Sequence, residues 1–189
     1  MISIRTILLA LLAGTLGLVQ LHAGNYSIDA SNSEVATTVH ASPRHQFTCS
    51  VTDYQADIEI DPTTLRVLKA NLDFNFNALD SRIKKRDSKM CNWMEIENHP
   101  SAHFEMTAVE PQASTGEFIA TGTLRMHGRS RPIQIPFTIT REGEKIRLAG
   151  QTEINYMNWG LEKIRMFIFS VKPLIQPYFK LEGTLKNDT

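Results

Sequence analysis

Short runs in which apolar and polar side chains alternate follow one another along almost the whole chain. Between residues 68 and 76, for example, every second side chain is apolar, and Lys, Asn or Asp stands between them. A period of two is typical of β-strands that turn one face to water and the other to a core. We therefore expect strands near 34–40, 45–51, 54–60, 66–77, 101–109, 117–127, 132–141, 145–156 and 176–186.

Many strands of this kind with few helices predict a sheet that curls around an apolar interior. The polar strand faces carry charged residues such as Asp73, Arg125 and Arg147, which a lipid environment would reject. The apolar faces must then point inward, so the fold class predicted is mainly β, a closed antiparallel up-and-down (lipocalin-like) barrel of about eight strands. The residues predicted to line its interior are Leu72, Phe74, Phe76, Phe104, Met106, Phe118, Leu124, Phe137 and Ile139.

One segment, 81–97, breaks the alternation because its apolar residues recur at helical spacing. Asp80 or Ser81 is a suitable N-cap, and Pro100 prevents the helix from continuing into the next strand. We expect this helix to cover an open end or flank of the barrel. A second short helix is predicted from Asn158 to Ile164.

The first 23 residues have the features of a secretory signal peptide. Arg5 precedes an apolar run at 7–19, and Leu21-His22-Ala23 suits cleavage after Ala23. The run is short for a membrane helix, and an uncleaved anchor is the alternative. We expect an exported protein in which 24–189 form a single domain without a stable membrane span.

Charge and motifs argue against several classes of function. Because 20 Lys and Arg balance 20 Asp and Glu, no broad attraction for nucleic acid is expected. His99 and His103 are four residues apart, but Pro100 between them opposes a helix that would align both rings for a metal. Residues 128–132 only half resemble a nucleophile elbow. We predict no metal site, no catalytic residue and no cofactor, with metal binding and hydrolysis as the weaker alternatives.

The two cysteines, Cys49 and Cys91, would enter a compartment in which disulfides form. A bridge requires that their Cα atoms lie close together, a distance that the sequence does not contain. The sequence leaves two alternatives, a Cys49–Cys91 disulfide and two buried thiols.

Several blocks, taken in order, resemble the YceI-like family of exported lipocalin-like barrels. They are Tyr26-Ser27-Ile28-Asp29-Ala30, Ile58-Glu59-Ile60-Asp61-Pro62, Arg86-Asp87-Ser88-Lys89-Met90, His99-Pro100-Ser101-Ala102-His103-Phe104 and the run from Gly122 to Ile133. The resemblance implies an eight-stranded barrel closed by a helix. It also implies a hydrophobic cavity that binds polyisoprenoid or another long-chain amphiphile in the periplasm. We add a quinone to the candidate ligands.

The predicted interior mixes large aromatic residues with Ala and Gly, so it can be open for a ligand or filled by its own side chains. An open interior predicts a lipid carrier. A filled interior predicts a non-enzymatic interaction protein of the bacterial envelope. For the oligomeric state, the sequence leaves a monomer and a homodimer as alternatives. The residues proposed for the cavity mouth or for a ligand head group are Arg86, Trp93, Arg129 and Trp159.

Overall fold

The computed structural model describes residues 23–41, 45–166 and 169–186. The predicted signal peptide, apart from residue 23, lies outside the described residues. No helix within the described ranges has the length and apolar composition that crossing a membrane requires.

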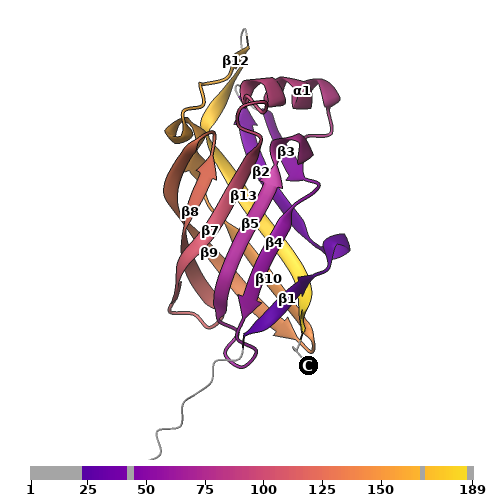
Figure 1. Ribbon diagram of the computed structural model, residues 1–189, viewed down its shortest axis with the longest axis vertical. Helices are drawn as coiled ribbons and strands as arrows, with labels where there is room; N and C mark the ends of the chain where they lie inside the picture. The colour runs from indigo at the N-terminus through magenta and orange to yellow at the C-terminus, as the bar shows by residue number, and fades with distance from the viewer. Residues whose placement is uncertain (1–22, 42–44, 167–168, 187–189) are drawn as a thin grey trace, which may run out of the picture.

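The described strands form one antiparallel sheet (Figure 1). Most of the predicted strands are present within one or two residues at each end. The strands are β1 Gly24–Ile28, β2 Glu34–Ala41, β3 His45–Val51, β4 Gln55–Ile60, β5 Val67–Asn75, β6 Leu79–Asp80, β7 Ser101–Pro111, β8 Glu117–Met126, β9 Arg129–Glu142, β10 Lys145–Gln151, β11 Ile154–Asn155, β12 Arg165–Met166 and β13 Phe169–Lys186.

The sheet closes into a barrel of eight strands in the order β1-β4-β5-β7-β8-β9-β10-β13, because β13 also pairs with β1. The closing register places Tyr26 opposite Leu185 and Ile28 opposite Gly183. The upper part of β13 pairs with β2 instead, β2 pairs with β3, and β3 pairs with β6. The predicted closed antiparallel barrel is therefore confirmed, with the β2–β3 hairpin completing its wall near one end.

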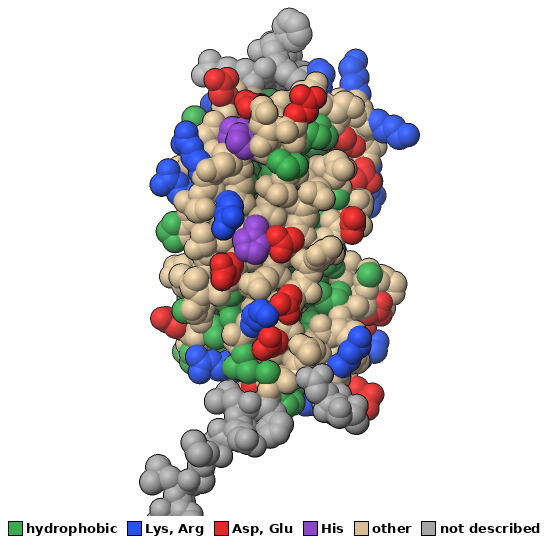
Figure 2. Space-filling model, viewed as in Figure 1, with side chains coloured by type: hydrophobic (Ala, Val, Ile, Leu, Met, Phe, Trp, Pro, Cys, Tyr) green, Lys and Arg blue, Asp and Glu red, His purple; other side chains and the backbone are tan. Residues whose placement is uncertain are grey.

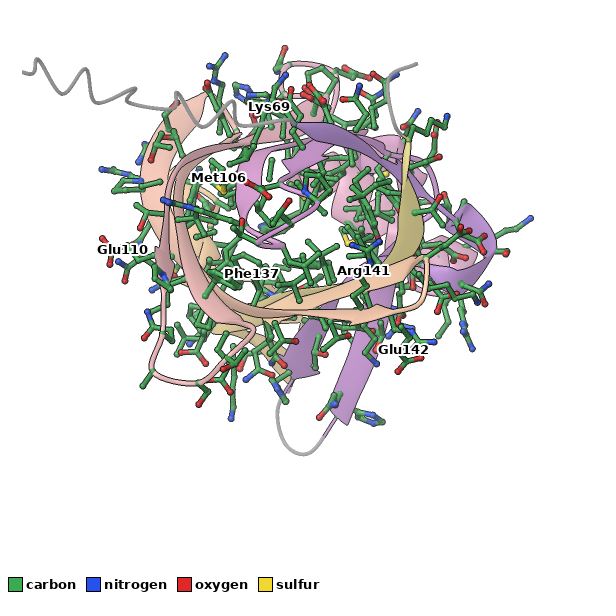
Figure 3. The ribbon with its side chains drawn as sticks, turned by 90° about the horizontal axis from the view of Figure 1, so that it is seen from below. Lys69, Met106, Glu110, Phe137, Arg141 and Glu142 are labelled. Atoms are coloured by element: carbon green, nitrogen blue, oxygen red, sulfur yellow. The ribbon has the colours of Figure 1, made fainter. Side chains whose placement is uncertain are left out.

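The period of two sorts side chains between the inside and the outside of this wall. Viewed along the barrel, Met106 and Phe137 lie inside the ring, whereas Lys69, Glu110 and Glu142 lie outside it (Figure 3). The face of the molecule seen in Figure 2 carries interspersed acidic and basic side chains, with hydrophobic ones in small separate groups. Alternation in the sequence thus corresponds to a solvated exterior and an apolar interior.

Helix α1, Lys84–Trp93, lies at the end of the barrel that also holds β12, and β1 lies toward the opposite end (Figure 1). We call these the α1 end and the β1 end. The helix begins three residues after the predicted start, because side-chain carboxylates accept hydrogen bonds from the backbone N–H groups of the preceding residues. Asp80 accepts a hydrogen bond from the Arg82 N–H at 2.7 Å, and Asp87 accepts one from the Ser81 N–H at 3.0 Å. Such bonds favour a turn over a helix.

The second predicted helix, at 158–164, is wrong. The structure has a short 3₁₀ turn at Tyr156–Trp159, and Gly160 ends it in the left-handed region at φ 88°. A left-handed residue interrupts a right-handed helix, so the chain leaves the turn at this point. Two further 3₁₀ turns are found at Ala30–Asn32 and Phe76–Ala78.

Candidate functional site: the barrel cavity

A cavity of about 940 Å³ occupies the barrel interior and extends to α1. Its wall is almost entirely apolar and comes from side chains of strands on all sides of the barrel. Of the predicted interior residues, those that line it are Leu72, Phe74, Phe76, Phe104, Met106, Leu124 and Phe137.

Two predicted lining residues, Phe118 and Ile139, lie elsewhere. Both belong to a packed cluster toward the β1 end, where the Phe118 and Phe137 rings stack with centroids 5.5 Å apart. Ile139 is 3% exposed in the same cluster. Their side chains point inward as predicted, but they fill the barrel at its packed end and do not face the cavity.

The β1 end is closed by buried side chains. Ile60 and Ile146 have no exposed surface, and the Tyr26 hydroxyl group donates a 2.9 Å hydrogen bond to the Ile146 carbonyl oxygen. Burial is the main cause that raises the pKa of Tyr26 above its ordinary value. Near the same end, Arg141 donates a hydrogen bond from Nη1 to the Pro62 carbonyl oxygen at 3.1 Å. Packed side chains therefore fill the described part of the barrel at this end.

Small residues in the wall play two different roles. At Gly122 and Gly150 the space is taken by neighbouring aromatic rings, because an added Cβ would lie 2.5 Å from the Phe104 ring and 2.7 Å from the Phe179 ring. These two glycines therefore make room for packed rings, which is the filled alternative at these two positions. The alanines that line the cavity are Ala36, Ala41, Ala56, Ala70, Ala102 and Ala120.

The cavity reaches α1, because Lys85, Arg86 and Lys89 of that helix are among the residues that line it. Ile83, which directly precedes the helix, lines the cavity and is 52% exposed. Lys85 and Lys89 of the helix and Gln46 of β3 also line it, and they are exposed. Residues that face both the cavity and solvent mark the mouth, so an entering molecule would pass between α1 and the β2–β3 hairpin.

Arg86 lines the cavity at this mouth and holds the start of α1 against the barrel. Its Nε donates to the Ser81 hydroxyl oxygen at 2.8 Å, and its Nη2 donates to the Ser81 carbonyl oxygen at 3.0 Å. The guanidinium carbon lies 3.9 Å from the centre of the Phe47 ring in β3. This stacking is a cation–π contact.

Of the two tryptophans proposed for the mouth, only Trp93 lines the cavity. Trp93 lines the cavity, donates from Nε1 to the Glu162 carbonyl oxygen at 2.9 Å, and meets the Tyr156 ring edge-on at 5.1 Å. Trp159 is 2% exposed and donates to the Leu124 carbonyl oxygen at 3.0 Å. It packs in a buried cluster with Phe76, Met94 and Tyr156 and is not among the residues that line the cavity.

Arg129 is also absent from the described cavity wall. Its guanidinium group lies over Gly160, where an added Cβ would come within 2.8 Å of it. The assignment of Arg129 and Trp159 to the mouth is therefore corrected. Trp159 belongs to the turn at 156–160, and Arg129 lies against Gly160 of the same turn, so neither side chain faces the cavity.

Cys49 and Cys91 are free thiols. Cys49 is 1% exposed, lines the cavity, and has its Sγ 4.0 Å from the Met90 Sδ. Burial raises the pKa of the Cys49 thiol to about 12, which leaves it protonated at neutral pH. The structure has no Cys49–Cys91 disulfide, and of the two free thiols only Cys49 is buried, because Cys91 is partly exposed.

His99 and His103 do not converge. His103 lies on the outer face of β7, and its Nδ1 is 2.7 Å from an Asp73 carboxylate oxygen on β5. His99 precedes β7 and contacts the ring of His127 instead. The histidine that lies beside His99 is His127, 28 positions further along the chain, and not His103.

With this geometry in place, the comparisons with known proteins identify the family. The profile of the YceI-like domain matches residues 26–185, nearly the whole of the described chain. The chain belongs to the YceI-like domain family. A UPF0312 protein of Pseudomonas putida strain GB-1 is 28% identical over 120 residues, which are 58% of this chain and 61% of that relative.

Solved structures share the YceI-like fold. BcnA of Burkholderia cenocepacia has a TM-score of 0.74 and 18% identity, with 84% of this chain and 100% of that chain covered. A polyisoprenoid-binding domain from Saccharophagus degradans, implicated in plant cell wall breakdown, has a TM-score of 0.64 and 14% identity, with coverages of 87% and 100%. The YceI protein of Campylobacter jejuni has a TM-score of 0.62 and 18% identity, with coverages of 74% and 85%.

Proposed function

We propose that this protein binds a long-chain apolar or amphiphilic molecule, a polyisoprenoid, a quinone or a similar lipid, inside its barrel. The observation that carries the proposal is the apolar cavity of about 940 Å³. This volume lies near the upper end of the range for ligand pockets, about 300–1,000 Å³. The polyisoprenoid-binding domain of Saccharophagus degradans, which has the same fold, supports the ligand class.

Burial of the chain supplies the binding free energy. Each methylene group that leaves water for an apolar wall contributes about 0.8 kcal/mol, so a long chain needs no polar contact along its length. The closed β1 end sets the depth available to it, because Ile60 and Ile146 seal the barrel there. The protein then selects its ligand mainly by chain length and bulk.

The mouth favours an anionic or polar head group. Lys85, Arg86 and Lys89 stand on one helix at the cavity opening. Cationic side chains form strong hydrogen bonds with phosphate or carboxylate oxygens. Inside the wall, the Thr37 hydroxyl group is buried without a protein partner among the described residues, so it is available to a hydroxyl or carbonyl group of a ligand.

The features of a signal peptide in residues 1–23 support a periplasmic location. In that compartment, a barrel that shields a hydrocarbon chain from water would act as a non-enzymatic carrier. The alternative, an envelope interaction protein, required an interior filled by its own side chains, and the cavity argues against it.

The direct test is mass spectrometry of organic extracts from protein purified without detergent. We expect about one long-chain lipid per chain. Ala70→Phe should reduce this loading several-fold, because Ala70 lines the cavity and a ring there would occupy the space of the chain. Ala149→Phe is the matched control, since Ala149 lies on the outer face of β10 and is exposed.

Circular dichroism of both variants establishes that they fold. A protein that carries no lipid and takes up neither a polyprenyl phosphate nor a long-chain ubiquinone would refute the carrier function. Equal loading of folded Ala70→Phe and Ala149→Phe would place the ligand outside the cavity.

A further inference from the structure

Glu95, His99 and His127 form a compact group outside the cavity wall. The nearest ligand atoms of the three side chains all lie within 4.8 Å of one another. The centroids of the two imidazole rings are 4.3 Å apart, and the His127 Nε2 is 4.0 Å from the Glu95 Oε2. Since 4.0 Å is longer than a hydrogen bond, these two atoms are not hydrogen-bonded to each other.

Backbone geometry from three segments brings the group together. Glu95 follows the C-cap of α1, and the His99 N–H donates to the Glu95 carbonyl oxygen at 2.9 Å, which closes a turn. His127 and Gly128 form the β8–β9 turn with positive φ of 47° and 68°. An added Cβ at Gly128 would lie 3.2 Å from the His99 Cε1, so the glycine leaves room for the His99 ring.

The hydrogen bonding of His127 determines which of its nitrogens is free. Its Nδ1 lies 3.2 Å from the Trp159 carbonyl oxygen, which can only accept, so Nδ1 carries the proton. In the neutral ring Nε2 then presents a lone pair. This Nε2 is buried and has no hydrogen-bond partner among the described residues. Donation of the other ring N–H to a backbone carbonyl is the usual outer contact of a metal-binding histidine.

We propose that Glu95, His99 and His127 bind a divalent transition-metal ion of the Zn²⁺ type. A cation between the His127 lone pair and the Glu95 carboxylate would satisfy both groups. Two histidines and one glutamate form a known zinc ligand set that keeps a fourth position for water, and imidazole favours zinc over magnesium or calcium.

The approach that metal binding requires is small. Bonds of about 2.0–2.2 Å at tetrahedral angles place two ligand atoms about 3.4 Å apart. The Glu95 side chain is 57% exposed and can change rotamer to close the distance, whereas the His127 side chain is 13% exposed and stays in place. The bound ion would tie the segment after α1 to the β8–β9 turn and to the start of β7. This site is separate from the cavity, so it does not depend on the proposed lipid.

The test uses the mature protein, prepared without a histidine tag and freed of metal with a chelator. Isothermal titration with zinc chloride should show one ion per chain. Glu95→Gln and His99→Gln should each weaken binding at least ~10-fold, the loss that even removal of an outer contact can cause. His103→Gln is the matched control because His103 pairs with Asp73 on the outer face of the barrel, and it should bind zinc as the wild type does.

Two further measurements separate a metal site from a role in folding. Circular dichroism should show that all three variants fold, and zinc should raise the melting temperature of the wild type and of His103→Gln only. Cobalt(II) bound to the wild type should give the visible absorption of a four-coordinate site, and Glu95→Gln should lack it. Failure of the wild type to bind zinc, or equal losses in His103→Gln and Glu95→Gln, would overturn the proposal.

Discussion

The hydroxyl group of Tyr26, in β1, donates a 2.9 Å hydrogen bond to the carbonyl oxygen of Ile146, in β10, 120 residues further along the chain. The two strands lie on opposite sides of β13, where Gly183 pairs with Ile28 on one edge and with Ile146 on the other. Gly183 lacks a side chain, and an added Cβ would lie 2.9 Å from the Tyr26 ring. The ring therefore crosses β13 over this glycine and ties three strands together at the point of closure.

Removal of this hydroxyl group should destabilise the barrel. We expect Tyr26→Phe to lower the free energy of unfolding by about 1–2 kcal/mol, because it leaves a buried carbonyl without this donor. Tyr54→Phe is the control, since the Tyr54 hydroxyl is buried without a partner among the described residues and its loss should be neutral or stabilising. Urea denaturation measures both, and equal effects would contradict the assigned role.

A side chain at position 183 should disturb closure more directly. Gly183→Ala would place a methyl group against the Tyr26 ring and the Ser27 carbonyl oxygen, and overpacking of this kind costs about 1–3 kcal/mol. Thr184→Ala, at the adjacent exposed position, should change stability by no more than about 0.5 kcal/mol. Thermal unfolding of the two variants compares them, and a Gly183→Ala protein as stable as the wild type would show that the barrel can open to accept the methyl group.

Acid should weaken the outer face of β13 through Glu182. Its carboxylate accepts hydrogen bonds from Lys145 at 2.7 Å and from Arg147 at 2.8 Å, and these bonds hold the Glu182 pKa below its ordinary value of 4.5. A carboxyl group with a lower pKa in the folded state contributes stability that is present above its unfolded pKa. That stability is lost as pH falls through the folded pKa.

The wild-type melting temperature should therefore fall as pH drops below about 4.5, and Glu182→Gln should start lower at neutral pH and fall less steeply. Glu144→Gln, at an exposed position near the Glu142-Gly143 turn, is the comparison. If Glu182→Gln and the wild type lose stability in parallel, other carboxyl groups account for the acid sensitivity.

The two thiols should differ in reactivity. Cys49 is 1% exposed with a pKa raised to about 12 by burial, whereas Cys91 is partly exposed on α1. Alkylation requires the thiolate, so iodoacetamide at about pH 8 should label one thiol in the native protein and two in denaturant. Cys91→Ser should show no native labelling. Rapid labelling of Cys49 in that folded variant would mean that the cavity admits the reagent and that the thiol is not shielded.

Much of the barrel could be predicted because alternation is a local property of a strand. The segments 101–109 and 117–127 correspond to β7 and β8 within two residues. β1 was not predicted because its five residues are too few for a pattern of period two to stand out. The helix predicted at 158–164 does not form, because Gly160 adopts a left-handed conformation.

The site was predicted less completely, since convergence of side chains depends on pairs far apart in the chain. Arg129 and Trp159 have the chemistry of a cavity mouth, but Trp159 is buried in the turn at 156–160 and Arg129 lies against Gly160 of that turn, so neither lines the cavity. Glu95 and His99 are close in sequence, and their approach to His127 required the β8–β9 turn to lie beside the end of α1.

The alternating pattern by itself determined that this chain forms strands with one apolar face, and therefore which side chains point into a barrel. Successive residues of a strand point to opposite faces whatever the strand pairs with, so this information is local. Only the tertiary structure decided where the interior is packed and where it is hollow. That outcome depends on the register in which β13 meets β1, β2 and β10, and on the ring sizes that each register places opposite one another.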